Sequence, residues 1–207
     1  MAIGLLSIVW QVFLERTFAD EIFAKARMSE NIKISGISEI NDNFKKIEWA
    51  DLLDSARYID LFFIWAQTWT NTYRDELKSV SKKKDVKIRL ILPDPNNEQT
   101  LKSLMDRMKL FDSEYIKTKI LETKRTYEEI FNENAHLEIW LIKKPLLFSI
   151  YRFDNKIIFA LSSHRTDKPS VPTFKFREGP IYKFLHDEIS FLTESEYSTK
   201  VYDNKKK

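Results

Sequence analysis

The chain has 207 residues, of which 43% are hydrophobic, 31% are charged and 14% are aromatic, and it contains only three Gly and six Pro. This composition predicts one globular domain and excludes a largely disordered or collagen-like chain. The net charge of +3 comes from 34 basic and 31 acidic residues, which is a mixed surface without the basic stripe typical of nucleic-acid binding. Nucleic acid is therefore not an expected partner.

The residue types that are rare or absent narrow the chemistry. There is no Cys, which excludes disulfides and thiol nucleophiles and favours a cytoplasmic location. Three scattered His do not predict a metal site. Gly4, Gly36 and Gly179 stand far apart, so the chain has neither a phosphate-binding Gly-rich loop nor a dinucleotide fingerprint, and no cofactor is expected.

The N-terminal segment is uncharged over residues 2–14, and basic residues follow at Arg16, Lys25 and Arg27. A membrane-spanning helix needs about 20 apolar residues, and no basic residues precede the run as they would in a signal peptide. Three alternatives remain: a packing or dimerising helix, the inner end of a membrane helix with basic cytosolic flanks, and a membrane-surface helix. We expect residues 1–28 to form an extra apolar helix, and the membrane alternatives would place the chain at the cytosolic face of the inner membrane.

Hydrophobic periodicity predicts the elements of the rest of the chain. The expected order is strand 31–37, helix 40–54, buried strand 57–65, helix 69–80, strand 86–92, helices 98–110 and 113–131, strands 135–142, 146–153 and 156–162, a loop 164–173 and helix 180–192. This order predicts an α/β domain over residues 29–197, with a single mixed sheet flanked by helices on both faces. Residues 198–207 are expected to be a frayed, polar, basic tail.

Two turns can be predicted in more detail. Asp154 and Asn155 separate two alternating strands, as in a tight hairpin. Asp94 or Asn96 is expected to cap the helix that follows the strand 86–92.

Polar side chains follow the predicted strands at their carboxyl ends, where open α/β sheets bind ligands. Thr68 and Asn71 offer hydroxyl and amide groups, and Trp69 offers a stacking face. At the other strand ends stand Asp94, Ser163, His164 and Arg165, of which the last two could bind an anion. The alternative is that Thr68 and Asp94 are helix caps and that His164 and Arg165 lie in a solvated loop.

Three segments resemble one half of a phospholipase D-like domain: residues 59–65, residues 87–95 and above all the hairpin 147–165. The family motif is His-x-Lys, four intervening residues and Asp, followed by a strand that ends in Gly-Ser or a similar pair. With Asp154 at the motif Asp, Leu147 takes the His position and Ser149 the Lys position, while Ser162 and Ser163 replace Gly-Ser.

The resemblance implies the fold without the family's nucleophile. Leu147 cannot form a covalent phospho-intermediate, and Ser149 carries no charge to stabilise a developing anion. Two halves form a site in this family, so the resemblance also implies a homodimer.

Two hypotheses for function follow. The first is a non-catalytic sensing domain, similar to parts of membrane-associated bacterial stress and phage-defence effectors, that binds a small anionic or nucleotide-like ligand through Thr68, Trp69, Asn71, Asp94, Ser149, Ser163, His164 and Arg165. The second is a divergent phosphodiesterase or nuclease with His164 as nucleophile and Arg165, Asp94 and Thr68 around it.

Overall fold

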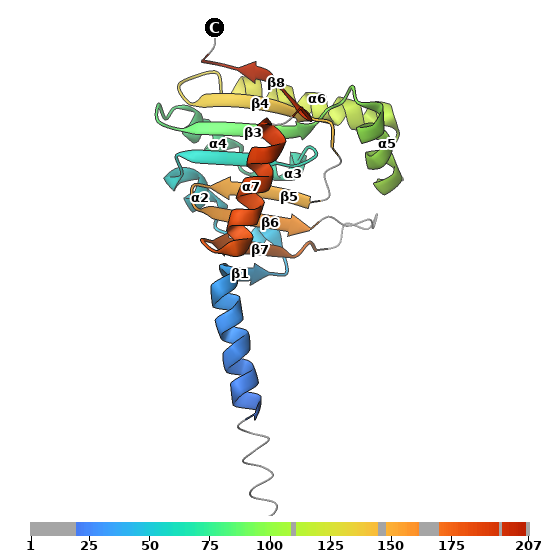
Figure 1. Cartoon of the computed structure of the whole chain (residues 1–207). Helices are drawn as coiled ribbons and strands as arrows, with labels where there is room; N and C mark the ends of the chain where they lie inside the picture. Colours follow the sequence, from blue (N-terminus) through green and yellow to red (C-terminus); the bar gives the residue numbers. More distant parts are fainter. Residues whose placement is uncertain (1–19, 109–110, 145–147, 162–169, 195, 206–207) are drawn as a thin grey trace, which may run out of the picture.

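An eight-stranded mixed sheet runs through the domain in the order β1-β7-β6-β5-β2-β3-β4-β8 (Figure 1). The computed structural model describes residues 20–108, 111–144, 148–161, 170–194 and 196–205. β2, β3 and β4 are parallel to one another, and every other neighbouring pair is antiparallel. The strands are β1 (Ile37–Asn41), β2 (Tyr58–Phe62), β3 (Lys87–Pro93), β4 (His136–Ile142), β5 (Phe148–Phe153), β6 (Lys156–Leu161), β7 (Thr173–Arg177) and β8 (Ser198–Asp203).

Helices cover both faces of this sheet, which confirms the predicted α/β class. Figure 1 shows α7 crossing one face, while the helices from α2 to α6 lie on the other side or at its edge. After the short helix η1 (Phe44–Lys46) come α2 (Trp49–Ser55), α3 (Gln67–Thr72), α4 (Arg74–Ser81), α5 (Glu98–Arg107), α6 (Ser113–Ile130) and α7 (Pro180–Glu194).

The parallel strands form the centre of the core. Leu61, Leu90 and Ile139 are fully buried, as expected for strands covered on both faces. The α3–α4 and α5–α6 segments make the two crossovers that parallel strands require. Because these three strands are parallel, the carboxyl ends of β2, β3 and β4 lie together at the same end of the sheet.

A helix at the start of the described residues extends past the predicted boundary. Residues 20–35 are helical and project from the domain beyond β1 (Figure 1), so the expected strand at 31–37 and the helix boundary at residue 28 are wrong. The alternation of Ile32 and Ile34 resembled a strand, but it lies on an exposed helix that ends at Gly36. Gly36 has φ +83°, and a Cβ there would lie 1.9 Å from the Glu178 carbonyl oxygen, so only glycine fits.

Membrane association stays a prediction. In the part of the chain that the structure describes, no helix is long and apolar enough to cross a membrane. The uncharged run 2–14 lies outside the described residues.

Other predicted boundaries also differ. The expected helix 40–54 is replaced by the end of β1, η1 and the shorter α2, because residues 37–41 pair with β7. The expected helix 69–80 is broken at Tyr73 into α3 and α4. The strand β7, which was not predicted, begins at Thr173, where the expected loop 164–173 ends. Asn97, rather than Asp94 or Asn96, caps α5 by accepting a hydrogen bond from the Thr100 backbone N–H at 2.9 Å.

The predicted frayed tail is a strand. Ser198–Asp203 forms β8, which pairs with β4, and Lys200 Nζ lies 2.9 Å from Glu138 Oε1. The polar composition of residues 198–203 gave no signal of a strand. They form one because they pair with β4, about sixty residues earlier in the chain, and not because they are hydrophobic.

Deleting residues 198–207 is expected to destabilise the domain and make it aggregate, since the deletion exposes the backbone groups of β4 as an unprotected edge. Thermal unfolding and the soluble fraction after expression measure both effects. Val201→Thr is the control because Val201 is exposed and threonine also favours strands. A soluble truncated protein with the parent melting temperature would show that β8 is dispensable.

Candidate functional site

A cavity of about 460 Å³ opens at the edge of the sheet where β2 and β6 end and β5 and β7 begin. Its polar lining residues are Gln67, Thr68, Ser149 and Thr173. Its aromatic lining residues are Phe44, Trp49, Trp65, Trp69, Phe111, Tyr115 and Tyr151. We call this space the edge cavity. The edge meant here is the one formed by the strand ends, not by the outer strands β1 and β8.

The edge cavity brings together three of the predicted site residues. Thr68 and Trp69 come from α3, and Ser149 comes from β5, far away in sequence. Asn71 instead lines a neighbouring cavity of about 280 Å³ between α3 and α6. Ser163, His164 and Arg165 lie outside the described residues, so their placement stays a prediction.

Asp94 is not among the residues described as lining either cavity. Its backbone N–H donates to the Ile142 carbonyl at 2.8 Å, and its Oδ1 accepts from the Asn96 N–H at 2.9 Å. The carboxylate therefore shapes the turn after β3. The expectation that Asp94 shares a site with Thr68 is not met.

Small side chains on three neighbouring strands leave room for the edge cavity. Ser149 on β5 is paired with Ala160 on β6, and Ala160 is paired with Thr173 on β7. Because paired residues in antiparallel strands project to the same face, these three side chains form one shallow row. The aromatic lining residues complete the walls.

Buried aromatic rings form one wall of the edge cavity. The ring centroid of Trp49 lies 5.4 Å from that of Trp69 and 4.9 Å from that of Tyr151, and the centroids of Trp69 and Tyr151 are 5.0 Å apart. The Trp49 indole N–H donates to the Phe44 carbonyl at 2.8 Å, which fixes its ring. In the sequence, Trp49 lies only within a predicted helix and Tyr151 only within a predicted strand, and neither carries a local signal of a site.

The backbone before α3 is strained at the cavity. Ala66 lines the cavity and has φ +40° and ψ +37°, the left-handed region that alanine rarely occupies. Such strain is held in place by the surrounding structure and is often found at functional sites. Here it turns the chain from the end of β2 into α3 and thereby sets Gln67 and Thr68 at the cavity.

Two buried polar atoms in the cavity residues have no hydrogen-bond partner: Trp69 Nε1 and Thr173 Oγ1. A buried donor without a partner costs about 1–3 kcal/mol. Burial also raises the pKa of the Tyr151 hydroxyl, which keeps it protonated and uncharged. The edge cavity therefore combines neutral hydrogen-bonding groups with aromatic surface.

Asp154 lies at the opposite end of the sheet from the edge cavity. It occupies the predicted β5–β6 hairpin with φ +50°, and its Oδ1 accepts hydrogen bonds from the backbone N–H groups of Tyr58 at 2.9 Å and Arg57 at 3.2 Å. Since Tyr58 begins β2, the carboxylate connects the hairpin to the amino end of the central strand. Its role in this structure is to hold the sheet together.

Asp154→Ala is expected to lower the free energy of unfolding by about 2 kcal/mol, because it removes these charge-assisted hydrogen bonds and places alanine in the left-handed region. Asp154→Asn keeps an acceptor oxygen and a residue that tolerates this backbone, so its loss should be smaller. Urea unfolding measures both variants. Equal stability of Asp154→Ala and the parent would contradict this structural role.

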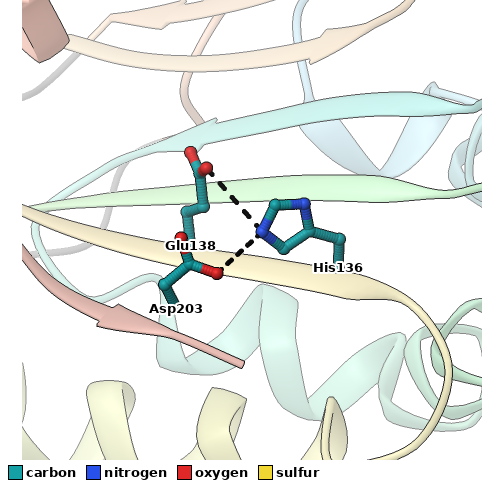
Figure 2. Close-up of side chains that lie close together, drawn as sticks. All are labelled: His136, Glu138 and Asp203. Atoms are coloured by element: carbon teal, nitrogen blue, oxygen red, sulfur yellow. Dashed lines mark hydrogen bonds and ion pairs between the residues drawn. The ribbon is translucent and has the colours of Figure 1, made fainter. Parts of the chain in front are cut away.

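A cluster of His136, Glu138 and Asp203 has the residue types of a metal site, but it is built as an ion-pair network. His136 Nε2 lies 2.9 Å from Asp203 Oδ1 and 3.7 Å from Glu138 Oε1 (Figure 2). The same Glu138 oxygen contacts Lys87 Nζ at 3.0 Å and Lys200 Nζ at 2.9 Å. Two ammonium groups thus already neutralise the carboxylates, and the network holds β8 against β4.

The chain shares a structural likeness with a protein of known structure. No family model matches the chain, and no curated protein matches it. Among solved structures it is similar to TrmBL2, an archaeal chromatin protein whose structure is described as showing a novel mode of DNA binding. The identity is 14%, the TM-score is 0.49, and the match covers 93% of this chain and 67% of that one. The phospholipase D-like resemblance and the exclusion of nucleic acid as a partner both stay predictions.

Proposed function

We propose that this chain is a non-catalytic ligand-binding domain of phospholipase D-like type, and that its ligand binds in the edge cavity. The observation that supports the proposal is the convergence of Thr68, Trp69 and Ser149, from two distant segments, on one concave aromatic site. Concave, mostly apolar sites with a few placed polar groups are typical of small-molecule binding.

The chemistry of the lining favours binding over catalysis. The described lining residues supply hydroxyl, amide and indole groups, but no imidazole, carboxylate or amine. Ser149, at the position that corresponds to the family lysine, has a neutral side chain in the cavity. Such groups can orient a ligand, whereas phosphoryl transfer also needs a nucleophile and positive charge.

The hairpin supports the phospholipase D-like part of the proposal. β5 and β6 lie inside the sheet between β2 and β7, and the Ser149 end of the hairpin opens on the cavity. We further propose that the N-terminal helix connects this sensing domain to a membrane or to a second copy of the chain.

The test compares the parent protein with Ala160→Phe, which fills the row of small side chains. The readouts are a thermal-shift screen of small metabolites and hydrolysis of bis(p-nitrophenyl) phosphate. We expect at least one compound to raise the melting temperature of the parent but not of Ala160→Phe, and we expect no hydrolysis. Hydrolysis that is lost in both Ala160→Phe and His164→Ala would overturn the proposal in favour of a phosphodiesterase.

A further inference from the structure

We infer that the ligand of the edge cavity is an uncharged aromatic heterocycle, the chemical class of a free nucleobase or nucleoside, rather than the anion that the sequence suggested. The inference rests on the proposed function, because it assumes that the cavity is a binding site. It follows from the charge, the shape and the unpartnered polar atoms of the described lining.

The charge of the site does not favour an anion. None of the described residues that line the edge cavity is a Lys, Arg, His, Asp or Glu. The neighbouring cavity, which shares Trp65 and Gln67, does contain cations, but Lys119 Nζ pairs with Glu122 Oε2 at 2.7 Å. Arg125 in turn is accompanied by Glu129, so this cavity has no net positive charge among its lining residues. A phosphate group would lose its hydration without a compensating ion pair.

The walls fit a flat, partly apolar molecule. Aromatic faces bind planar rings by offset or edge-to-face contacts. Trp65 and Phe111 have ring centroids 6.2 Å apart, and Phe111 stacks on Tyr115 at 4.6 Å. Phe111 and Tyr115 are exposed, so these faces are accessible at the mouth of the cavity. The volume of about 460 Å³ holds one small heterocycle.

Trp69 Nε1 and Thr173 Oγ1 indicate where hydrogen bonds to the ligand would form. Trp69 and Thr173 are 3% and 1% exposed, and both side chains belong to the cavity lining. An indole N–H can only donate, so it requires an acceptor such as a ring nitrogen or an exocyclic carbonyl oxygen. Both atoms are closed to solvent, so a hydrogen bond between either atom and the ligand requires a neighbouring wall side chain to move aside. Binding should therefore change the surroundings of Trp69.

The experiment titrates the full chain with adenosine, cytidine, indole, adenosine 5′-monophosphate, inorganic phosphate and glucose. Tryptophan fluorescence and the melting temperature are the readouts, since three of the five tryptophans line the cavity. We expect an uncharged heterocycle to change the fluorescence and raise the melting temperature, and the phosphorylated compound to bind no more tightly than its nucleoside.

Thr173→Val tests the unpartnered hydroxyl with an isosteric side chain. We expect it to raise the melting temperature of the free protein and to weaken heterocycle binding about tenfold, the effect of one lost hydrogen bond. Thr199→Val is the matched control, because Thr199 is an exposed strand threonine far from the cavity. Unchanged affinity in Thr173→Val would overturn the assigned hydrogen bond.

The other outcomes separate this inference from the proposed function. Binding of the nucleotide or of phosphate, but not of the nucleosides, would overturn the uncharged class while supporting a ligand site. Binding of glucose alone would overturn the heterocycle in favour of a sugar. If no compound of this panel bound, while an unrelated metabolite stabilised the parent but not Ala160→Phe, only the ligand class would be wrong. No stabilisation by any screened metabolite would overturn both.

Discussion

Replacing Asp60 with alanine is expected to lower the free energy of unfolding by about 3–5 kcal/mol, because it leaves two arginines without their buried partner. Asp60 is 1% exposed on central strand β2. Its Oδ1 accepts from Arg89 Nε at 2.7 Å, and its Oδ2 accepts from Arg89 Nη2 at 2.9 Å and from Arg152 Nε. The three residues are register partners on neighbouring strands, so the loss affects β5, β2 and β3 together.

Asp85→Ala is the matched control for this substitution. Asp85 pairs with Arg57 at 3.4 Å, but both side chains are mostly exposed, and such pairs contribute about 1 kcal/mol or less. Chemical denaturation of the two variants gives the comparison. Similar losses in Asp60→Ala and Asp85→Ala would contradict the importance of the buried network.

The same network predicts how stability depends on pH. Burial alone would raise the pKa of Asp60, but the hydrogen bonds and charges of Arg89 and Arg152 outweigh burial and lower it. A carboxylate with a lowered pKa stabilises the folded state above its unfolded pKa, and this contribution is lost as the pH falls through the folded value. We expect the parent to lose stability below about pH 4. Asp60→Asn should show a shallower loss over the same range in melting curves.

Trp49→Ala should lower the free energy of unfolding by about 3–5 kcal/mol, the usual cost of removing a large buried aromatic side chain. Trp49 is 1% exposed, and its ring contacts those of Trp69, Tyr73, Tyr151 and Phe153. The same ring is a wall of the edge cavity, so the substitution should also enlarge that cavity. Urea unfolding measures the loss of stability.

Phe184→Ala is the control for this loss, because Phe184 is an aromatic residue of α7 that is 66% exposed. Its truncation should change stability by about 0.5 kcal/mol or less. Trp49→Phe, which keeps an aromatic ring, should lie between the two. A Trp49→Ala protein as stable as Phe184→Ala would show that the aromatic cluster contributes little.

The parts of the fold that sequence predicted well have a local signal. The continuous apolar run of β2 indicated a strand covered on both faces, the apolar residues of β3 and β4 indicated two further strands, and the polar pair Asp154 and Asn155 indicated the hairpin. Pro180 was correctly expected at the start of α7. Two of the parts that were wrong, the end of the helix over residues 31–35 and β8, depend on tertiary context: the helix ends where Gly36 approaches Glu178, and β8 is a strand because β4 pairs with it.

The candidate site also contains some residues that the sequence could predict and others that it could not. Thr68 and Trp69 could be predicted because they follow a buried strand, and Ser149 because the family motif singled out its position. Thr173 and Tyr151 could not, since their place at the cavity depends on the register between antiparallel strands, which carries no local signal. Asp94 satisfied the same strand-end rule, yet its turn takes the carboxylate elsewhere.

The position of β8 at the outer side of β4 also constrains how the protein is made. The ribosome synthesises β1 to β7 and α7 before β8, so the nascent chain holds β4 with one open flank until β8 has emerged. Chains of this size commonly expose hydrophobic surface and unpaired strand edges while they fold, and both promote aggregation. A chaperone that shields strand edges would act on this intermediate.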